Sequence, residues 1–566
     1  MKIHPPSTYR VILSLFLLGV FLLTLNSLSD PDTGFHLATG KVVVQEKSVP
    51  TYDVLSYTAQ GQRWVSHYWL SGVLFYLVFL VGGAWGLIVC VALVAVLTYA
   101  ILVKIIQLHI GRWALTFVVL VPFVYFTMEQ WVVRPQIFTY LFSVFLLYLL
   151  ELWRKSSYER TTPLFLLLPI MLLWANMHAG VVLGMAIIGA YALGMLVNVG
   201  FSNPTRFIAS WAIFLASWVM TLLNPNGVSV LLYSKIISEP AQQLQIGEWM
   251  SLLKILGDGW RPQTYLFLMV CSLVIVAVWA IREKKTWFRE HLTLLFVFSG
   301  AFLLPLISVR HTALFPLLAA PIVIAALFHS VGSQRAFFLA QRASVVGLLC
   351  ALGGVAVLGG VMHVWAMPAW NVHVLPVGAA DFIEEHNLQG PMFNTMEAGG
   401  YLAWRLWPEQ RVFLDGRNEV FIGKPIQDFI SMVFLFDGWE RVFDSYHFGY
   451  AVIRYRDWDS FDIDPVLSRL MKTLMEKEGF RLVYWDDAVA LLVAPREENK
   501  EIIDTYEYKI VTPLIDPTSI PQEQWPGAEE EFNRALQTSE PSYLLDNYAI
   551  RFVHAQRILR GTGKGR

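Results

Sequence analysis

The most constraining feature of this sequence is the recurrence of long apolar runs throughout its first 365 residues. About 20 apolar residues are needed for a helix to cross the hydrocarbon core of a bilayer, and eleven runs approach or reach that length. They lie at residues 11–28, 85–106, 113–128, 135–153, 163–177, 180–199, 207–223, 262–281, 291–308, 312–328 and 344–365. The sequence therefore predicts a polytopic α-helical membrane protein, with 113–128 and 163–177 as its shortest spans.

Charge divides the chain into two parts. Residues 1–365 contain 22 Lys and Arg against 12 Asp and Glu, whereas residues 366–566 contain 20 against 31. The second part has the composition of a water-soluble domain. The three cysteines lie far apart in apolar runs, which argues against a disulfide scaffold or a zinc finger. The sequence has no cluster of Lys and Arg of the kind that binds nucleic acids, which argues against that function.

The segment from Trp69 to Val81 is apolar but short, and Gly82 and Gly83 follow it. We interpret it as an interfacial or partly inserted helix rather than a crossing. With eleven spans, the short inner loops hold 14 basic and three acidic residues, as the positive-inside rule requires. This topology predicts a multi-pass protein of the inner (cytoplasmic) membrane and cell envelope. Its N-terminus is cytoplasmic and its C-terminal domain is periplasmic or extracellular.

In this topology the outer loops contain most of the chemically unusual residues. The first loop, residues 29–84, opens with an acidic stretch, and the later outer loops add arginines, histidines, an amide and a further carboxylate. We single out Asp30, Asp32, His36, Arg134, Asn176, His178, Glu248, Arg310 and His311. Ionisable groups at the membrane edge are costly, so their gathering on one face predicts a functional site.

Each of these residues also has a plain structural interpretation. Asp30 and Asp32 could cap a helix, and Arg134 could extend its side chain toward lipid headgroups. Asn176 and His178 lie between two apolar runs, where a turn requires polar residues. Glu248 could be a solvated acid beside Trp249.

The soluble part reads as an α/β domain over residues 366–495. An amphipathic helix is expected at 376–387, with short strands at 391–394, 411–414, 450–454 and 488–493. Asp415-Gly416-Arg417 follows one of these strands and is either a functional loop or a simple turn. Residues 496–566 form an acidic extension with a helix at 541–560. No phosphate-binding glycine loop or zinc-protease motif is present.

Several short motifs resemble a poorly characterised bacterial branch of the GT-C superfamily, the integral-membrane glycosyltransferases that use polyprenyl-phosphate-linked sugars. The acidic motif Asp30-Pro31-Asp32-Thr33-Gly34-Phe35-His36 resembles the first-loop motif of that superfamily. The further matching strings are Val49–Asp53, Trp64–Leu70, Arg134–Gln136, Trp174–His178, Glu248-Trp249, Gly399–Leu402 and Phe413–Arg417. The Trp-Trp-Asp-Tyr-Gly signature of oligosaccharyltransferases is absent from residues 366–566, so transfer to an asparagine sequon is not expected.

The resemblance implies a GT-C-like transmembrane module over residues 1–365 that transfers a sugar, with inversion, from a polyprenyl-phosphate donor to an extracytoplasmic acceptor. That acceptor could be a glycan, a lipid or a protein. Asp32 would be the catalytic base, and Asp30 would orient the acceptor or bind a metal. Arg134 and Arg310 would hold the phosphate.

The remaining candidate residues complete this expected site. His36, Asn176, His178 and His311 would contact the donor or acceptor. Glu248 could join Asp30 and Asp32 at a divalent cation. Two alternatives stay open: a non-catalytic GT-C-like scaffold, and a transporter of lipid-linked glycan, although few charges lie mid-span and no inverted repeat is evident.

Overall fold

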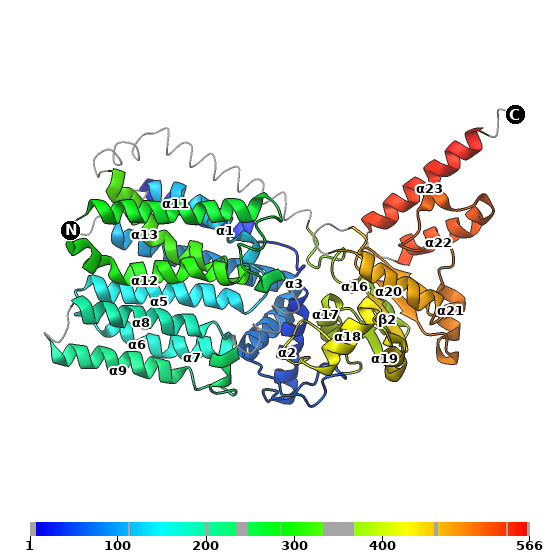
Figure 1. Ribbon diagram of the computed structural model, residues 1–566, viewed down its shortest axis with the longest axis horizontal. Coiled ribbons are helices and arrows are strands. Elements are labelled where there is room, and N and C mark those ends of the chain that lie inside the picture. Colours follow the sequence, from blue (N-terminus) through cyan, green and yellow to red (C-terminus); the bar gives the residue numbers. More distant parts are fainter. Residues whose placement is uncertain are drawn as a thin grey trace. The chain divides into compact units, whose positions relative to one another are not determined.

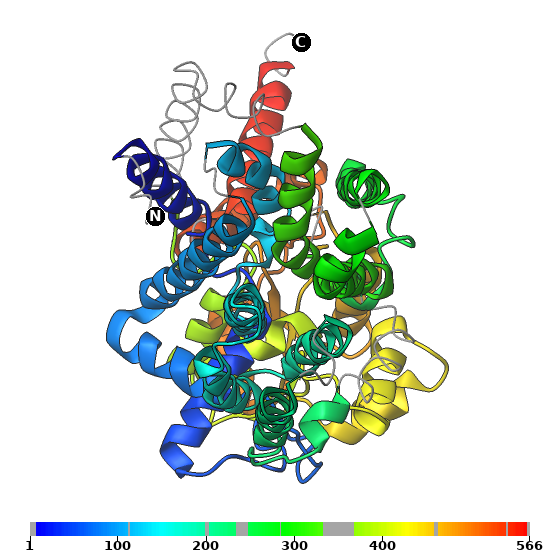
Figure 2. The same ribbon diagram turned by 90° about the vertical axis from the view of Figure 1, so that its left-hand side faces the viewer.

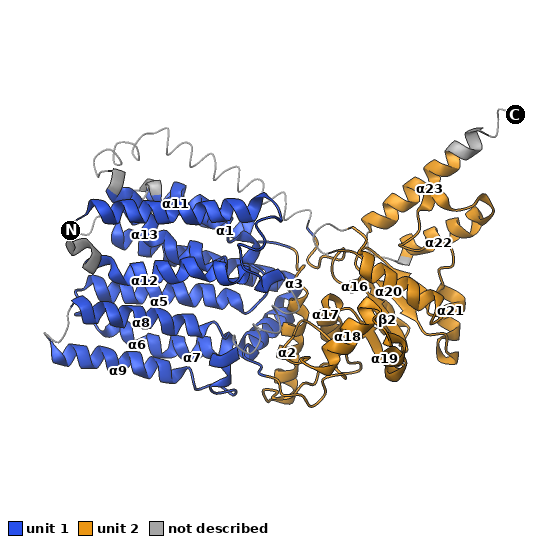
Figure 3. Cartoon of the chain, viewed as in Figure 1, with its two compact units in different colours: residues 1–26, 65–367 blue, residues 27–64, 368–566 orange. Residues whose placement is uncertain are grey.

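The structure is a computed structural model that describes residues 7–110, 114–198, 203–233, 247–283, 285–331, 367–457, 462–538 and 542–562. The chain divides into two compact units, which Figure 3 colours separately. Unit 1 comprises residues 1–26 and 65–367, and unit 2 comprises residues 27–64 and 368–566. The predicted outer loop 29–84 is thus shared, since its first part packs with the C-terminal residues.

Unit 1 is a bundle of apolar helices with roughly parallel axes (Figures 1 and 2). Its main helices are α1 (Ser7–Leu23), α3 (Trp69–His109), α4 (Ala114–Tyr125), α5 (Gln136–Lys155), α6 (Thr162–Phe165), α7 (Leu167–Met177), α8 (Val181–Asn198), α9 (Pro204–Met220), α11 (Trp260–Arg282), α12 (Lys285–Ile307) and α13 (Leu314–Val331). Helix α5 packs on α3 and α8, and α13 packs on α11 and α12. Helices α5 and α13 are buried on nearly all sides, whereas α3, α8, α11 and α12 each keep exposed apolar side chains.

These helices agree closely with the apolar runs. Among the described residues, five helices are long and apolar enough to cross a membrane: α3, α5, α8, α11 and residues 290–307 of α12. Four shorter apolar segments, in α1, α4, α6–α7 and α13, fall on further predicted spans. The predicted span 344–365 lies outside the described residues. The total of eleven crossings therefore stays a prediction.

The segment Trp69–Val81 is helical and forms the first part of α3. At Gly83 the backbone leaves the helical conformation, with φ of 57° and ψ of −152°, so α3 consists of two helices joined at a kink. Glycine adopts a positive φ at little cost, which explains why the break occurs at the Gly82-Gly83 pair. The change of direction keeps residues 69–81 distinct from the apolar run that follows.

Unit 2 is built on a small mixed sheet with strands β1 (Met392–Asn394), β2 (Tyr450–Ile453), β3 (Arg481–Trp485) and β4 (Ala490–Val493). Their order is β1-β2-β4-β3, with β1 parallel to β2 and the other neighbours antiparallel. Strands β1, β2 and β4 are buried along their whole length. Helices α16 (Val377–Glu385), α17 (Met396–Leu406), α18 (Lys424–Phe434), α19 (Trp439–Tyr446) and α20 (Pro465–Glu476) surround the sheet.

One strand prediction for this domain was wrong, and one strand was not predicted. Residues 411–414 are not a strand, because Val412 makes only an isolated parallel bridge with Ser56. Strand β3 was missed, although it pairs with β4 through a register shift between Leu482 and Tyr484. The predicted helix at 376–387 is confirmed as α16.

The C-terminal extension is mostly helical, with α21 (Lys500–Tyr506), α22 (Trp525–Thr538) and α23 (Tyr543–Thr562). Asp487, in the turn before β4, holds the start of α23. Its carboxylate accepts hydrogen bonds from the Ser542 hydroxyl at 2.8 Å and from the amides of Tyr543 and Leu544 at 2.8 and 2.9 Å. A side chain distant in sequence thereby satisfies the free amides at the helix start.

Candidate functional site

The acidic motif forms the start of helix α2 (Asp32–Glu46), which belongs to unit 2. Asp30 Oδ1 accepts a hydrogen bond from the Asp32 amide at 2.8 Å, so Asp30 satisfies one of the free amides at this helix end. Asp30 and Asp32 are partly exposed, whereas every residue from Thr33 to Gly40 is buried. The two carboxylates therefore lie at the accessible start of a helix whose next eight residues are enclosed, while its last three residues, Val44–Glu46, are exposed again.

His36 lies one helical turn after Asp32, on the same side of α2. Its side chain is buried, and its ring centroid lies 4.3 Å from that of Phe35. The structure thus groups three of the predicted site residues, Asp30, Asp32 and His36, within the first turns of one helix.

Helix α2 is enclosed because it packs closely against α17 within unit 2. A Cβ atom placed on Gly34 would lie 2.2 Å from the carbonyl oxygen of Gly400, and one placed on Gly400 would lie 2.3 Å from that of Pro31. The two backbones therefore touch at these glycines, and any larger residue would separate the helices. This contact explains Gly400 of the C-terminal motif, whereas a Cβ on Gly399 would lie 1.9 Å from the carbonyl oxygen of Leu414.

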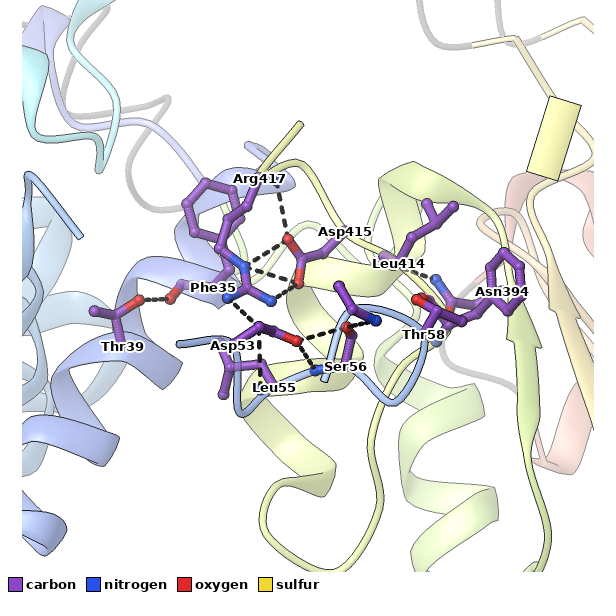
Figure 4. Close-up of polar contacts among 12 residues, drawn as sticks. Phe35, Thr39, Asp53, Leu55, Ser56, Thr58, Asn394, Leu414, Asp415 and Arg417 are labelled. Atoms are coloured by element: carbon purple, nitrogen blue, oxygen red, sulfur yellow. Dashed lines mark hydrogen bonds and ion pairs between the residues drawn. The ribbon is translucent and has the colours of Figure 1, made fainter. Parts of the chain in front are cut away.

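The Asp415-Gly416-Arg417 motif lies beside the same helix start. A Cβ atom on Gly416 would lie 2.4 Å from Asp32 Oδ1. Arg417 is completely buried and forms ion pairs with two carboxylates: Nη1 lies 2.7 Å from Asp53 Oδ1, and Nη2 lies 2.7 Å from Asp415 Oδ2. Figure 4 shows the guanidinium between the two acids. The motif is thus more than a simple turn.

The remaining predicted site residues belong to unit 1. Arg134 precedes α5, Glu248 lies in a 3₁₀ turn at Gly247–Trp249, and Arg310 lies in a second such turn at Val309–His311. Arg134 Nη1 is 2.5 Å from Glu248 Oε1, and Arg310 Nη1 is 4.0 Å from Glu248 Oε2. The Ser308 hydroxyl donates to the Glu248 carbonyl at 2.7 Å and joins the two turns.

This group of two arginines and one carboxylate carries a net charge of +1. Burial alone would raise the pKa of Glu248, but the charges of Arg134 and Arg310 lower that pKa to about 2. Glu248 is therefore ionised at neutral pH. Its side chain is still 42% exposed, so solvent weakens the ion pairs and leaves the carboxylate replaceable by another anion. We call Arg134, Glu248 and Arg310 the arginine cluster.

His178 ends α7 and is held as a neutral imidazole. Its Nδ1 accepts a hydrogen bond from the Gly180 amide at 3.1 Å and lies 2.7 Å from the Thr139 hydroxyl. The Gly180 amide can only donate, so Nδ1 is an acceptor and the Thr139 hydroxyl donates to it; the Thr139 oxygen in turn accepts from the Trp174 indole at 3.0 Å. Because Nδ1 is an acceptor, the ring proton is on Nε2. Burial, and then the neighbouring His67, keep the pKa of His178 well below 6.5.

Two further histidines accompany it. His67 is buried and packs against Tyr233, with ring centroids 3.8 Å apart and ring planes inclined by 39°, and its ring lies 5.9 Å from that of His178. Burial lowers the pKa of His67 to about 3 and, together with the charge of Arg310, lowers that of His311 to about 4. At neutral pH these side chains are uncharged hydrogen-bonding groups.

Asn176 makes a structural contribution. Its Oδ1 accepts from the Trp69 indole at 3.0 Å, and its Nδ2 donates to the carbonyls of Leu172 and Leu223, both at 2.9 Å. One amide proton thus bonds within α7 and the other joins α7 to the segment after α9, while the side-chain oxygen joins α7 to the start of α3. This arrangement fits a residue that positions its neighbours.

A metal site with at least three protein ligands is not formed in the part of the chain that the structure describes: no group of three or more His, Cys, Asp or Glu side chains has the required arrangement. Both carboxylate oxygens of Glu248 face arginines. Asp30 and Asp32 have the hard oxygen donors that Mg²⁺ and Mn²⁺ prefer.

Sequence reasoning missed three elements of these arrangements. Thr139 and Tyr233 contact the histidines but belong to no recognised motif. The pairing of Asp53 with Arg417 was also missed, although both residues lie in strings that resemble the bacterial branch. A charged residue within an otherwise apolar, motif-like string was the available signal, because such residues are rarely buried unless they are paired.

Comparisons with known proteins give a fold relationship. No protein-family model and no curated protein matches the chain. The alignment with the Archaeoglobus fulgidus oligosaccharyltransferase in its apo form covers 95% of this chain and 84% of the chain of that enzyme. Its TM-score is 0.56, and the sequences are 12% identical. The same archaeal enzyme, AglB, in complex with an inhibitory peptide and a dolichol-phosphate aligns with 99% and 87%, again with a TM-score of 0.56 and 12% identity.

A third structure, in which that oligosaccharyltransferase is tethered to an acceptor peptide containing the NVT sequon, covers 79% of this chain and 69% of its own. Its TM-score is 0.51 at 12% identity. These matches span unit 1 and unit 2, so the chain has the GT-C fold of these enzymes. The predicted resemblance to the GT-C superfamily is thereby confirmed for the fold.

Proposed function

We propose that this protein is a membrane glycosyltransferase that moves a sugar from a polyprenyl-phosphate carrier to an acceptor outside the cytoplasm. The carrying observation is the pair of partly exposed carboxylates, Asp30 and Asp32, at the start of helix α2, where the eight residues that follow them are all buried. A GT-C fold over nearly the whole chain supports the same reaction class. So does AglB, which is known in complex with a dolichol-phosphate.

In the proposed reaction Asp32 is the base. An acceptor hydroxyl oxygen attacks the anomeric carbon while its proton passes to the Asp32 carboxylate. The bond between the anomeric carbon and the phosphate oxygen breaks, and the electron pair leaves with the lipid phosphate. Attack from the face opposite the phosphate inverts the configuration. Asp30 orients Asp32 through its bond to the Asp32 amide.

We assign binding of the departing phosphate to the arginine cluster. Arg134 and Arg310 present fixed positive charges, and guanidinium groups match phosphate oxygens in a bidentate geometry. His178 and His311 are neutral and would donate single hydrogen bonds to phosphate or sugar oxygens. His36, beside Asp32 on α2, would contact the acceptor or the donor sugar, while Asn176 would hold its neighbours in place.

A divalent cation is compatible with this proposal. Asp30 and Asp32 would supply its protein oxygen ligands, and the cation would balance the charge that develops on the phosphate. Glu248 is less suited to that role than sequence suggested, because its carboxylate pairs with two arginines.

The orientation in the membrane is part of the proposal. The positive-inside pattern of the loops supports a cytoplasmic N-terminus and an extracytoplasmic unit 2. In this orientation the acidic end of α2 works on the side of the membrane where polyprenyl-linked sugars are consumed. The acceptor, whether glycan, lipid or protein, would be reached from that side.

The decisive experiment is a transfer assay on the purified full chain in lipid nanodiscs. A panel of synthetic polyprenyl-phosphate hexoses and pentoses would be supplied together with the native membrane fraction as a source of acceptors. We expect release of polyprenyl phosphate from at least one donor, and a loss of about 100-fold or more in Asp32→Asn, the usual contribution of a general base. Asp437→Asn, an exposed acid in the same unit, is the matched control and should retain the wild-type rate.

Other outcomes would favour the alternatives. Equal rates in wild type, Asp30→Asn and Asp32→Asn would refute the assignment of the base. Movement of a labelled polyprenyl-phosphate sugar across vesicles without bond cleavage would indicate a transporter. A wild-type protein that shows neither activity over the panel would be a scaffold.

A further inference from the structure

The most heavily buried ionic group in unit 2 has no part in the reaction proposed above. The side chains of Arg417, Asp53 and Asp415 are all completely buried. The ring of Trp64 covers the guanidinium, whose central carbon lies 4.5 Å from the ring centroid. Burying three charges costs several kcal/mol of desolvation free energy per ion before their mutual attraction is counted. The arrangement is therefore stable only if many hydrogen bonds to the buried groups offset that cost.

Both acids are in fact well supplied with donors (Figure 4). Asp53 Oδ2 accepts from the Ser56 amide at 3.0 Å and from the Ser56 hydroxyl at 2.6 Å, and Oδ1 accepts from the Leu55 amide at 3.3 Å. Asp415 Oδ1 accepts from the amide of Arg417 at 2.9 Å and from its Nε at 2.8 Å. A buried network with this many hydrogen bonds and ion pairs fixes the backbone of every segment that contributes to it.

Gly416 lies between the two C-terminal members of this network and touches the proposed base. A Cβ atom on Gly416 would lie 2.4 Å from Asp32 Oδ1 and 3.1 Å from the ring of Phe35. The φ angle of Gly416 is outside the left-handed range, so backbone conformation does not require glycine here. A side chain at this position would instead displace the Asp32 carboxylate.

We propose that Arg417, held between Asp53 and Asp415, is a positioning residue that fixes the Asp32 carboxylate through the backbone of Gly416. The inference rests on the proposed function, because it gives Asp32 the role of base. The network holds residues 415–417 rigid, and Gly416 then forms one wall against which Asp32 is placed. Through its ion pair with Arg417, Asp53 connects the segment that follows α2 to residues 415–417.

Positioning matters here because proton transfer depends steeply on geometry. A base must lie within hydrogen-bond distance of the proton that it accepts, and a displacement of about 1 Å can lower a rate about 100-fold. Asp32 is on the first turn of its helix, where the side chain is only partly enclosed. A rigid backbone wall restricts its movement while leaving it open to substrate.

Turnover in the donor assay provides the first test. Gly416→Ala places a methyl group against Asp32, so we expect kcat to fall about 10- to 100-fold, with little change in KM for the donor. The acid limb of the pH profile should also shift, because the carboxylate moves into new surroundings. Arg417→Lys keeps the positive charge but lacks the two guanidinium nitrogens that pair with Asp53 and Asp415. It should therefore retain more activity than Arg417→Met, which has no charge.

Gly527→Ala is the matched control. Gly527 lies in α22 of the same unit, and a Cβ there would meet only the flexible end of Ile510. It should leave kcat and the pH profile unchanged. If Asp32→Asn abolishes turnover while Gly416→Ala and Arg417→Lys behave like wild type, the positioning role is refuted and the proposed function stands.

Hydrogen exchange tests the mechanical coupling without any substrate. In Asp53→Asn we expect faster amide exchange in peptides covering residues 30–40 as well as 412–420, and no change in α23. Unchanged exchange over residues 30–40 would overturn the inference whether or not the protein has transferase activity. Faster exchange there in a protein without turnover would uphold the coupling and count against the proposed function alone.

Discussion

Gly34 of α2 and Gly400 of α17 bring two helices into backbone contact: a Cβ on Gly34 would lie 2.2 Å from the Gly400 carbonyl oxygen and 2.5 Å from the Tyr401 amide nitrogen. Backbone atoms within a helix cannot shift without breaking its hydrogen bonds. The pair therefore determines how close the helix that begins with Asp32 lies to the C-terminal residues of unit 2.

The glycine contact predicts that Gly34→Ala destabilises unit 2 by about 1–3 kcal/mol, the range for overpacking a dense interior. The methyl group would force α2 away from α17. Thermal unfolding of the purified protein would measure the loss. Gly19→Ala, in the apolar helix α1, has no atom within 4 Å of the new Cβ and should leave the transition unchanged or raise it slightly.

The arginine cluster predicts a gain of anion affinity when its acid is neutralised. Glu248→Gln raises the net charge of the cluster from +1 to +2, so polyprenyl phosphate should bind more tightly, and the gain should shrink as salt is added. Titration of the protein in nanodiscs with polyprenyl phosphate at two ionic strengths would measure it. Glu129→Gln is the control, since Glu129 pairs with a different arginine, Arg261. Weaker binding by Glu248→Gln would contradict the phosphate assignment.

The buried histidines predict that the protein loses stability in acid. The pKa of His67 is lowered from 6.5 to about 3, chiefly by burial. Between these values the unfolded chain binds a proton that the folded chain does not, so the free energy of unfolding falls as pH falls from about 6.5 toward 3. One such group contributes up to about 1.4 kcal/mol per pH unit.

The measurement is the unfolding midpoint from pH 7.5 to 5. The replacement His67→Gln removes one titrating group and should give a shallower pH dependence than wild type. An identical slope in both proteins would show that His67 is protonated in the folded state or is hydrated there.

A second ionic group, in unit 1, predicts a large stability effect away from the candidate site. Glu151 of α5 is fully buried and accepts hydrogen bonds from Arg154 Nε at 2.8 Å and from the Tyr191 hydroxyl at 2.5 Å, while His109 Nε2 lies 2.8 Å away. Removing one partner of a buried pair leaves an uncompensated charge, so Glu151→Gln should cost about 3–5 kcal/mol.

Denaturant unfolding of the purified protein in micelles would measure this cost. The double variant Glu151→Leu/Arg154→Leu removes both charges and should be closer to wild type than Glu151→Gln is. A single variant as stable as wild type would mean that the carboxylate contributes nothing to the packing of α3, α5 and α8.

Much of unit 1 was predictable because a membrane span is a local property of the sequence. A run of about 20 apolar residues predicts a membrane helix without knowledge of the rest of the chain. Helices such as α5 and α11 begin and end close to the predicted limits. Unit 2 was less predictable because its pairings are distant in sequence. Val412 reads as part of a strand, yet its only bridge is to Ser56, and the local pattern contains no information about that partner.

The same reason separates what was predicted of the candidate site from what was not. Asp30, Asp32 and Arg134 were recognised by residue type and by their place beside an apolar run. The contact of Gly416 with Asp32 depends on how α2 packs, and no property of either residue alone indicates it. The double pairing of Glu248 likewise required two turns that are distant in sequence.

Because residues 27–64 pack with residues 368–566, the order of synthesis matters for this protein. The Thr58 hydroxyl bonds to the carbonyl of Phe413, which the ribosome adds 355 residues later. At about 5–20 residues per second, the segment that carries Asp32 waits roughly 20–70 s for its partners. During that interval helix α2 has no α17 to cover its buried face. Until the C-terminal residues have been added, the apolar side chains on that face have no partner within unit 2.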